Sequence, residues 1–357
     1  MRKQASLAPL TIHQPPRSLM KHGQHWFNQV RKTAEAIFGR NAFPDGAFDF
    51  PAAFELPEAV FDTHPPVAPA LQAGARFLNG VYENAAGTRR YKLYIPSTWK
   101  GQRLPLVVML HGCAQDPDDF AAGTQMNAVA EERKCFVLYP AQSPDANNSR
   151  CWNWFNALDQ RHGQGEPSII AGMTQQVCDH YPVSRNQVYI AGMSAGGAMA
   201  IIVGTLYPEL FCAVGVHSGL PYAAARDLPS ALAAMQRGAF GASQTASAGL
   251  PMIVFHGDQD TTVHPANGEE LLAQGLRSHP LGGTARPSRL AGRVPDGYAY
   301  TRIKHWLHDG SPLAEHWVIH GAGHAWSGGS AAGSYTDGKG PDASREMMRF
   351  FSTVRAG

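Results

Sequence analysis

The chain has 357 residues, of which 44% are hydrophobic and 16% are charged, and its formal net charge is +2. This composition supports a large core and excludes global disorder. The small net charge gives no indication of a nucleic-acid partner. No continuous apolar run reaches the roughly 18 residues of a membrane-spanning helix, so we expect no transmembrane segment.

The first 73 residues differ in composition from the rest, and we expect an extension at 1–73 followed by one large domain at 74–357. Residues 18–38 have apolar side chains at helical spacing, which predicts an amphipathic helix. This helix either packs on the main domain or attaches to an apolar surface such as a polymer granule. Residues 44–70 are rich in Pro and Ala, as is typical of an extended linker.

The start of the chain is basic but lacks the apolar core of a secretory signal. We therefore expect a cytoplasmic protein, with a secreted or periplasmic location as the alternative if the start is trimmed.

Segments typical of strands and helices alternate beyond the extension. Two antiparallel strands, at 76–84 and 89–96, are predicted first, at an edge of the sheet. Further strands are expected at 104–112, 135–140, 187–193, 211–219, 251–258 and 315–321, and helices at 168–182, 194–208 and 342–354, the last capped by Asp342 or Ser344. The alternation predicts an α/β fold with a mostly parallel central sheet and helices on both faces.

Two segments, 221–250 and 278–300, show no clean periodicity. Loops of this length are either surface connections or lids, and both interpretations stay open here.

The segment "GMSAG" at 192–196 matches the G-x-S-x-G motif and lies between a predicted strand and a predicted helix. Gly192 and Gly196 let neighbouring backbone approach a tight turn without a Cβ clash. The helix begins at Ser194, so its N-terminus points toward any negative charge that develops there. The motif therefore predicts Ser194 as a nucleophile.

A serine hydroxyl needs a base that removes its proton. His324 follows the last predicted strand and fits the chain order serine, acid, histidine, so it is the predicted base. We interpret His320, four residues earlier, as a hydrogen-bonded structural histidine. Asp258 and Asp260 both follow the preceding strand, and either could orient the base.

An oxyanion needs two backbone N–H donors. Ala195 follows the nucleophile and supplies the first, and Cys113, after the strand 104–112, is placed to supply the second. Cys151 also follows a strand at this edge. A Cys113–Cys151 disulfide is therefore a hypothesis, although an intracellular location argues against it.

Aromatic side chains near the predicted site are Trp152, Trp154 and Trp326. Trp152 and Trp154 belong either to the core or to a wall on which substrate stacks, and Trp326, two residues after His324, is the strongest candidate for substrate contact. No metal or cofactor is expected, since the pair His305 and His308 lacks a carboxylate cluster. The acidic loop 334–342 is the one alternative, as a Ca²⁺ site.

Several motifs occur in order over residues 75–357: "LHGCAQ", "CWNWF", "AGMSAGGAMA", "HGDQDTTVHPANG" and "GAGHAWSGG". Together they resemble the polyhydroxybutyrate depolymerase-type esterase family, which includes feruloyl and acetylxylan esterases. The resemblance implies an α/β-hydrolase fold, a catalytic domain at 74–357, and cofactor-free cleavage of carboxylic esters through an acyl-enzyme. Because the family's acid stands just before "TTV", the resemblance favours Asp260 over Asp258.

The expected partner is an ester substrate, with a polyhydroxyalkanoate-type polymer as one candidate. The alternatives are a feruloyl or acetylxylan esterase and, outside catalysis, a granule-binding or partner-binding protein on a hydrolase scaffold.

Overall fold

The structure, a computed structural model, describes residues 71–239, 241 and 249–354. The predicted helix at 18–38 and linker at 44–70 lie outside the described residues. Within the described residues, no helix is long and apolar enough to cross a bilayer.

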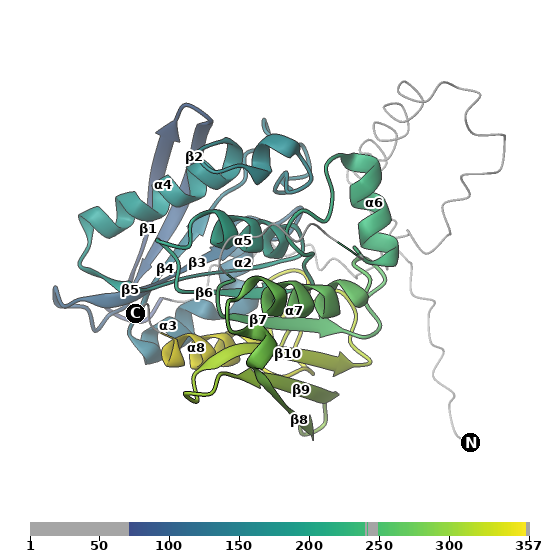
Figure 1. The fold of residues 1–357 in the computed structure, drawn as a ribbon. Coiled ribbons are helices and arrows are strands. Elements are labelled where there is room, and N and C mark those ends of the chain that lie inside the picture. Colours follow the sequence, from purple (N-terminus) through teal and green to yellow (C-terminus); the bar gives the residue numbers. More distant parts are fainter. Residues whose placement is uncertain (1–70, 240, 242–248, 355–357) are drawn as a thin grey trace, which may run out of the picture. The chain divides into compact units, whose positions relative to one another are not determined.

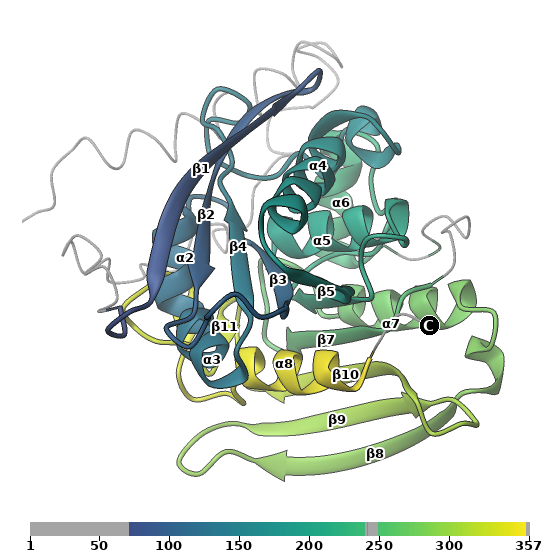
Figure 2. The same cartoon turned by 90° about the vertical axis from the view of Figure 1, so that its left-hand side faces the viewer.

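A ten-stranded sheet runs through the described domain in the order β1-β2-β4-β3-β5-β6-β7-β10-β9-β8 (Figures 1 and 2). Its strands are β1 (Arg76–Asn84), β2 (Gly87–Ile95), β3 (Leu104–Leu110), β4 (Phe136–Pro140), β5 (Val183–Met193), β6 (Ala213–His217), β7 (Met252–Gly257), β8 (Arg286–Arg293), β9 (Ala299–Trp306) and β10 (Pro312–His320). The six strands from β4 to β10 are parallel, and an antiparallel pair extends each edge. This confirms the mostly parallel sheet and the β1–β2 edge pair.

Helices cover both faces of the sheet (Figure 2). They are α2 (Pro117–Thr124), α3 (Met126–Arg133), α4 (Gly165–His180), α5 (Ala195–Leu206), α6 (Leu228–Arg237), α7 (Ala266–Ser278) and α8 (Ala343–Thr353), with short 3₁₀ turns η2 (Ala157–Gln160) and η3 (Gly282–Thr284). The core is split by the sheet because strand side chains alternate between faces. In β3, Leu106, Val108 and Leu110 pack with α4, α5 and α7, while Val107 and Met109 pack with α2, α3 and α8.

The two segments without periodicity contain regular structure. Residues 221–250 contain α6, which lies on the side toward which the arrowheads of β7 and β10 point (Figure 1). Residues 278–300 contain β8 and the start of β9, which corrects the expectation of a loop. Nearly every residue of β8 is exposed, so this edge strand needs no apolar alternation and left no signal in the sequence. Asp342 is the cap of α8, where its side chain accepts a hydrogen bond from Arg345 N.

Candidate active site

The carboxyl ends of five neighbouring parallel strands form one edge of the sheet. In spatial order these strands are β3, β5, β6, β7 and β10. Ligands of open α/β sheets bind at such an edge. The residues that follow these strands, or end them, are Cys113, Ser194, His217, Asp260 and His324. The predicted nucleophile, base, acid and oxyanion-hole positions therefore all follow neighbouring strands.

Ser194 occupies a strained turn between β5 and α5. Its φ is 56° and its ψ is −122°, a conformation that costs a non-glycine residue of the order of 1–3 kcal/mol. Its N–H donates to the carbonyl oxygen of His217 at 2.9 Å, which ties the turn to β6. A Cβ on Gly196 would overlap the carbonyl oxygen of Leu110, and one on Gly192 would overlap that of Gly196. Both glycines are therefore required for the close packing of the turn.

Gly197 is in a different situation. A Cβ there would lie 3.1 Å from Gly192 O and 3.2 Å from Val216 Cγ1, which is tight but not an overlap. This glycine allows close packing of α5 on the sheet rather than the turn itself.

His324 and Asp260 are in direct contact. Nδ1 of His324 lies 2.7 Å from Oδ2 of Asp260. The other carboxylate oxygen, Oδ1, accepts the backbone N–H groups of Thr262 at 2.9 Å and Val263 at 2.8 Å. An ionised carboxylate at Oδ2 requires hydrogen on Nδ1, which leaves Nε2 of His324 free to accept a proton.

The Asp260 side chain is 0% exposed. Burial by itself raises the pKa of this carboxyl, but the charge of His324 and the hydrogen bonds from His256 and His324 outweigh it and hold the pKa well below its usual range. Asp260 is therefore a buried carboxylate that remains ionised at neutral pH.

Asp258 contacts the other histidine of this region. Its Oδ2 lies 2.9 Å from Nδ1 of His320, and its Oδ1 accepts the N–H of Gly321 at 2.7 Å. The second ring nitrogen of His320 lies 2.9 Å from Thr301 Oγ1 on β9. His320 is thus hydrogen-bonded on both nitrogens, as expected for a structural histidine. The pair braces the turn after β7 against the loop after β10.

The loop after β3 is held in place by a side chain that the sequence did not single out. Gln115 Oε1 accepts the N–H of Gly112 at 2.9 Å, and its amide nitrogen donates to Asp119 Oδ2 at 2.8 Å. Cys113 forms a disulfide with Cys151, as hypothesised from their positions. The remaining cysteines of the described residues are buried free thiols.

The loop that carries Cys151 is anchored by a buried carboxylate, Glu166, at the start of α4. Glu166 Oε2 accepts the N–H of Asn153 at 2.7 Å, and Oε1 accepts Asn153 Nδ2 at 2.9 Å and Arg89 Nη2 at 3.2 Å. Burial, followed by the charge of Asp159, raises the pKa of Glu166. Because these contacts link residues far apart in the sequence, no local sequence pattern predicts the role of Glu166.

The three tryptophans are buried side chains, which favours the core interpretation that was open for Trp152 and Trp154 and leaves substrate contact by Trp326 as a prediction. Trp152 is 0% exposed, Trp154 is 5% exposed and Trp326 is 1% exposed. The indole N–H of Trp152 donates to His111 O at 3.1 Å, and that of Trp326 donates to Ser344 Oγ at 3.2 Å. Indoles with a satisfied N–H pack well in a core.

His217, the last residue of β6, contacts the nucleophile turn, because its carbonyl oxygen accepts the N–H of Ser194. Its ring stacks between Phe255, with centroids 5.8 Å apart, and Trp326, at 5.2 Å. Its Nε2 accepts the N–H of Ser327 at 3.0 Å. Burial, with smaller contributions from His256 and His324, lowers the pKa of His217 to about 3, so the ring is neutral at pH 7.

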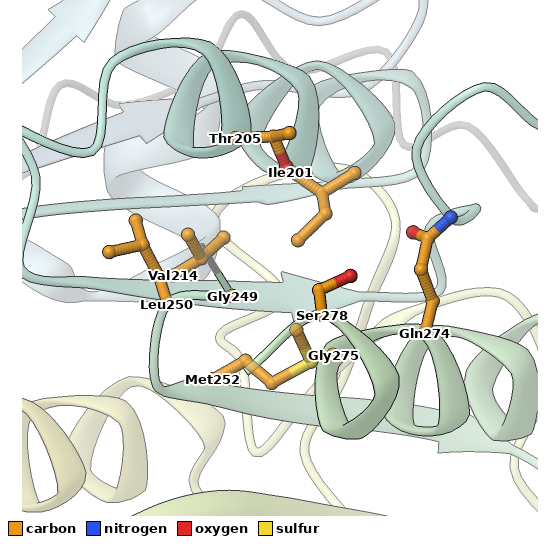
Figure 3. A pocket seen from close by; sticks show the side chains of 9 residues that line it. All are labelled: Ile201, Thr205, Val214, Gly249, Leu250, Met252, Gln274, Gly275 and Ser278. Carbon is orange, nitrogen blue, oxygen red and sulfur yellow. The ribbon is translucent and has the colours of Figure 1, made fainter. Parts of the chain in front are cut away.

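The pocket in Figure 3 contains none of the predicted catalytic residues in its lining. Its lining comes from the C-terminal half of α5, the beginning of β6, the segment that leads into β7, the first residue of β7, and α7: Ile201, Thr205, Val214, Gly249, Leu250, Met252, Gln274, Gly275 and Ser278. No acid, base or nucleophilic thiol lines it, and it lies at the strand beginnings. Nowhere in the described part of the chain do three or more His, Cys, Asp or Glu side chains gather as metal ligands. In the loop 334–342, Asp337 accepts the Tyr298 hydroxyl at 2.9 Å, and Asp342 caps α8.

Residues 89–294, more than half of the 357 residues, match the family model described as Esterase PHB depolymerase. The chain belongs to this family. Poly(3-hydroxyalkanoate) depolymerase C from Paucimonas lemoignei is 32% identical over 232 residues, which cover 62% of this chain and 54% of that protein. Feruloyl esterase B from Thermothelomyces thermophilus is 29% identical over 231 residues, covering 58% of this chain and 76% of that protein.

This chain thus spans about half the length of the first of these relatives. Among solved structures, an acetyl xylan esterase from Aspergillus awamori superposes with a TM-score of 0.58 at 19% identity, over 78% of this chain and 99% of that one. At this identity the likeness establishes the fold alone, and it confirms the predicted α/β-hydrolase fold.

Proposed function

We propose that the protein is a serine carboxylic-ester hydrolase with Ser194 as nucleophile, His324 as general base and acid, and Asp260 as the residue that orients His324. The observation that carries this proposal is the 2.7 Å contact between His324 Nδ1 and Asp260 Oδ2, two strands from the strained Ser194 turn. This combination of a strained serine and an oriented imidazole is what acyl transfer to a hydroxyl requires.

The reaction proceeds in two halves. Ser194 Oγ attacks the ester carbonyl carbon while His324 Nε2 takes the hydroxyl proton, and the oxyanion accepts the backbone N–H groups of Cys113 and Ala195. The tetrahedral intermediate collapses, His324 protonates the departing alcohol, and an acyl group remains on Ser194. Water then attacks the acyl carbon, passes its proton to His324, and frees the acid and the serine.

Ala195 suits its part in this scheme because it is the first residue of α5, whose leading N–H groups have no partner within the helix. The helix is apolar and almost wholly buried, so its N-terminal dipole acts in a medium of low dielectric. The loop that carries Cys113 is fixed by the Cys113–Cys151 disulfide and by the hydrogen bond from Gly112 N to Gln115 Oε1. This fixed geometry supports Cys113 as the second oxyanion donor.

We infer polyhydroxyalkanoate-type esters as the substrate class, because a poly(3-hydroxyalkanoate) depolymerase is among the relatives of highest identity. Feruloyl and acetylxylan esters are the alternative, since relatives with these names align over similar lengths.

Two assays test the function. Short p-nitrophenyl esters are expected to be cleaved, and Ser194→Ala is expected to abolish this activity; full activity in that variant would refute the nucleophile. A panel of polyhydroxybutyrate film, its soluble oligomers, methyl ferulate and acetylated xylan then ranks the substrates by kcat/KM. The highest kcat/KM on a ferulate or an acetylated sugar would replace the inferred substrate class.

Granule contact through residues 1–70 has its own test. Deleting them is expected to leave turnover of soluble esters unchanged and to weaken binding to polymer granules. Equal binding by both forms would leave the extension without this role.

The disulfide bears on location. Disulfides persist in oxidising compartments, so Cys113–Cys151 favours a secreted or periplasmic site over the cytoplasm expected from the sequence. Alkylation of the protein isolated from its native cells and unfolded without reductant should label Cys135, Cys178 and Cys212 only. Labelling of Cys113 and Cys151 as well would favour the cytoplasm.

A further inference from the structure

A second histidine contacts the carboxylate of Asp260. His256, near the end of β7, is 1% exposed. Its Nε2 lies 2.8 Å from the carbonyl oxygen of Val263 and 3.4 Å from Oδ2 of Asp260. Oδ2 of Asp260, which lies 2.7 Å from His324 Nδ1, is therefore also in contact with the buried imidazole of His256.

The contact with Val263 fixes which nitrogen of His256 carries hydrogen. A carbonyl oxygen only accepts, so Nε2 must be the protonated nitrogen, and this nitrogen also lies 3.4 Å from Oδ2 of Asp260. The other nitrogen, Nδ1, is buried without a hydrogen-bond partner.

An apolar side chain of similar volume at this position would avoid the cost of that unpartnered nitrogen. The imidazole is therefore best explained by what its Nε2–H does. It closes the turn that carries Asp260: the Val263 N–H donates to Asp260 Oδ1 at 2.8 Å, and the Val263 carbonyl accepts from His256. The Val263 N–H thus holds Oδ1 of the carboxylate, while the His256 ring lies against Oδ2 at 3.4 Å.

We propose that His256 is a positioning residue, which fixes Oδ2 of Asp260 in the direction that His324 needs. The inference rests on the proposed function and deepens it. His256 does not contact the reacting atoms; it acts through Asp260. Its contribution to the low pKa of Asp260 agrees with a donated hydrogen bond.

The chain offers a matched control in His316 on β10. This residue is 2% exposed, and its Nε2 is also buried without a partner. Both imidazoles abut α7 at the same point, because a Cβ on Gly268 would lie 3.0 Å from His256 Nδ1 and 3.0 Å from His316 Nε2. His316 therefore has the burial, the unpaired nitrogen and the helix contact of His256, but it has no hydrogen bond to Asp260.

The test compares kcat and KM on a p-nitrophenyl ester for four proteins: wild type, His256→Leu, His256→Gln and His316→Leu. His256→Leu removes the donor, and misplacing a catalytic group by about 1 Å costs about a hundredfold, so we expect kcat to fall about tenfold to a hundredfold with KM unchanged. Glutamine presents an amide N–H near the position of Nε2, so His256→Gln should stay within about threefold of wild type. His316→Leu should leave kcat unchanged.

Three results would overturn the inference: full kcat in His256→Leu, an equal loss in both His256 variants, or the same loss in His316→Leu. If His256→Leu does not fold, His256→Asn replaces it with the same expected loss, because its shorter amide does not reach Asp260. Labelling of Ser194 by a fluorophosphonate separates the two levels of the proposal. Wild type that is not labelled refutes the proposed function and this inference together. Labelled wild type with full turnover in His256→Leu refutes this inference alone.

Discussion

Replacing Asp260 by asparagine exchanges one carboxylate oxygen for an NH₂ group, and the structure gives the contacts of both oxygens. Two backbone N–H groups, of Thr262 and Val263, contact Oδ1, and His324 and His256 contact Oδ2. An amide has one accepting oxygen, so it must choose between these two sides. Turning the oxygen toward His324 gives up two backbone hydrogen bonds of about 1 kcal/mol each and sets the NH₂ against two N–H donors.

The preferred orientation of the asparagine amide in Asp260→Asn therefore presents NH₂ to His324. With a penalty of about 2–3 kcal/mol, the productive orientation is populated roughly 1–3% of the time. In the preferred orientation Nδ1 of His324 must accept, which moves its hydrogen to Nε2 and removes the base that Ser194 needs. The negative charge that stabilises the imidazolium is also lost. We expect kcat to fall about 10³-fold to 10⁴-fold.

The assay is kcat on a p-nitrophenyl ester at pH 7–8, with the midpoint of thermal unfolding measured alongside. Asp258→Asn is the matched control, because Asp258 also pairs with a histidine and a backbone N–H, at 2.9 Å and 2.7 Å. It should lose less than about tenfold, since it acts through loop position only. A larger loss for Asp258→Asn than for Asp260→Asn would refute the assignment of the acid.

Three further predictions concern stability and the site's supports. Burial lowers the pKa of three imidazoles, to about 4 for His111 and about 3 for His217 and His316, so the unfolded state binds more protons below pH 6.5. The free energy of unfolding from urea titrations should therefore fall by about 4 kcal/mol for each unit by which the pH is lowered between about pH 6 and 4, and His316→Leu should remove about a third of that slope; an unchanged slope would contradict the assignment. Gly196→Ala, which forces a Cβ onto a backbone oxygen, should destabilise by more than about 3 kcal/mol and abolish turnover, whereas Gly197→Ala should cost under about 1.5 kcal/mol; equal effects would refute the packing argument. Cys151→Ser opens a link across 38 residues and should cost about 3–4 kcal/mol of stability, lower kcat and make turnover insensitive to dithiothreitol; wild-type stability and turnover in this variant would remove the disulfide from the site.

The sequence by itself predicted the parallel strands of the sheet and the turn that carries Ser194. Continuous apolar runs such as that of β3 are readable because a strand covered on both faces has no polar positions, and they placed the parallel strands. The turn around Ser194 was readable because its glycines are required locally, by backbone atoms within a few residues and on the next strand. Chain order, together with its place in the loop beyond the last strand, predicted His324 rather than His320 as the base.

Only the tertiary structure decided the contacts between separate loops. Asp258 and Asp260 lie two residues apart in one turn, and their spacing does not reveal that one meets His320 and the other His324. The same holds for the disulfide between Cys113 and Cys151, and for the burial of the tryptophans after β4. The physical reason is that a turn's side-chain directions follow from its hydrogen bonds, such as those from His256 and Val263, and these form only once the chain is folded.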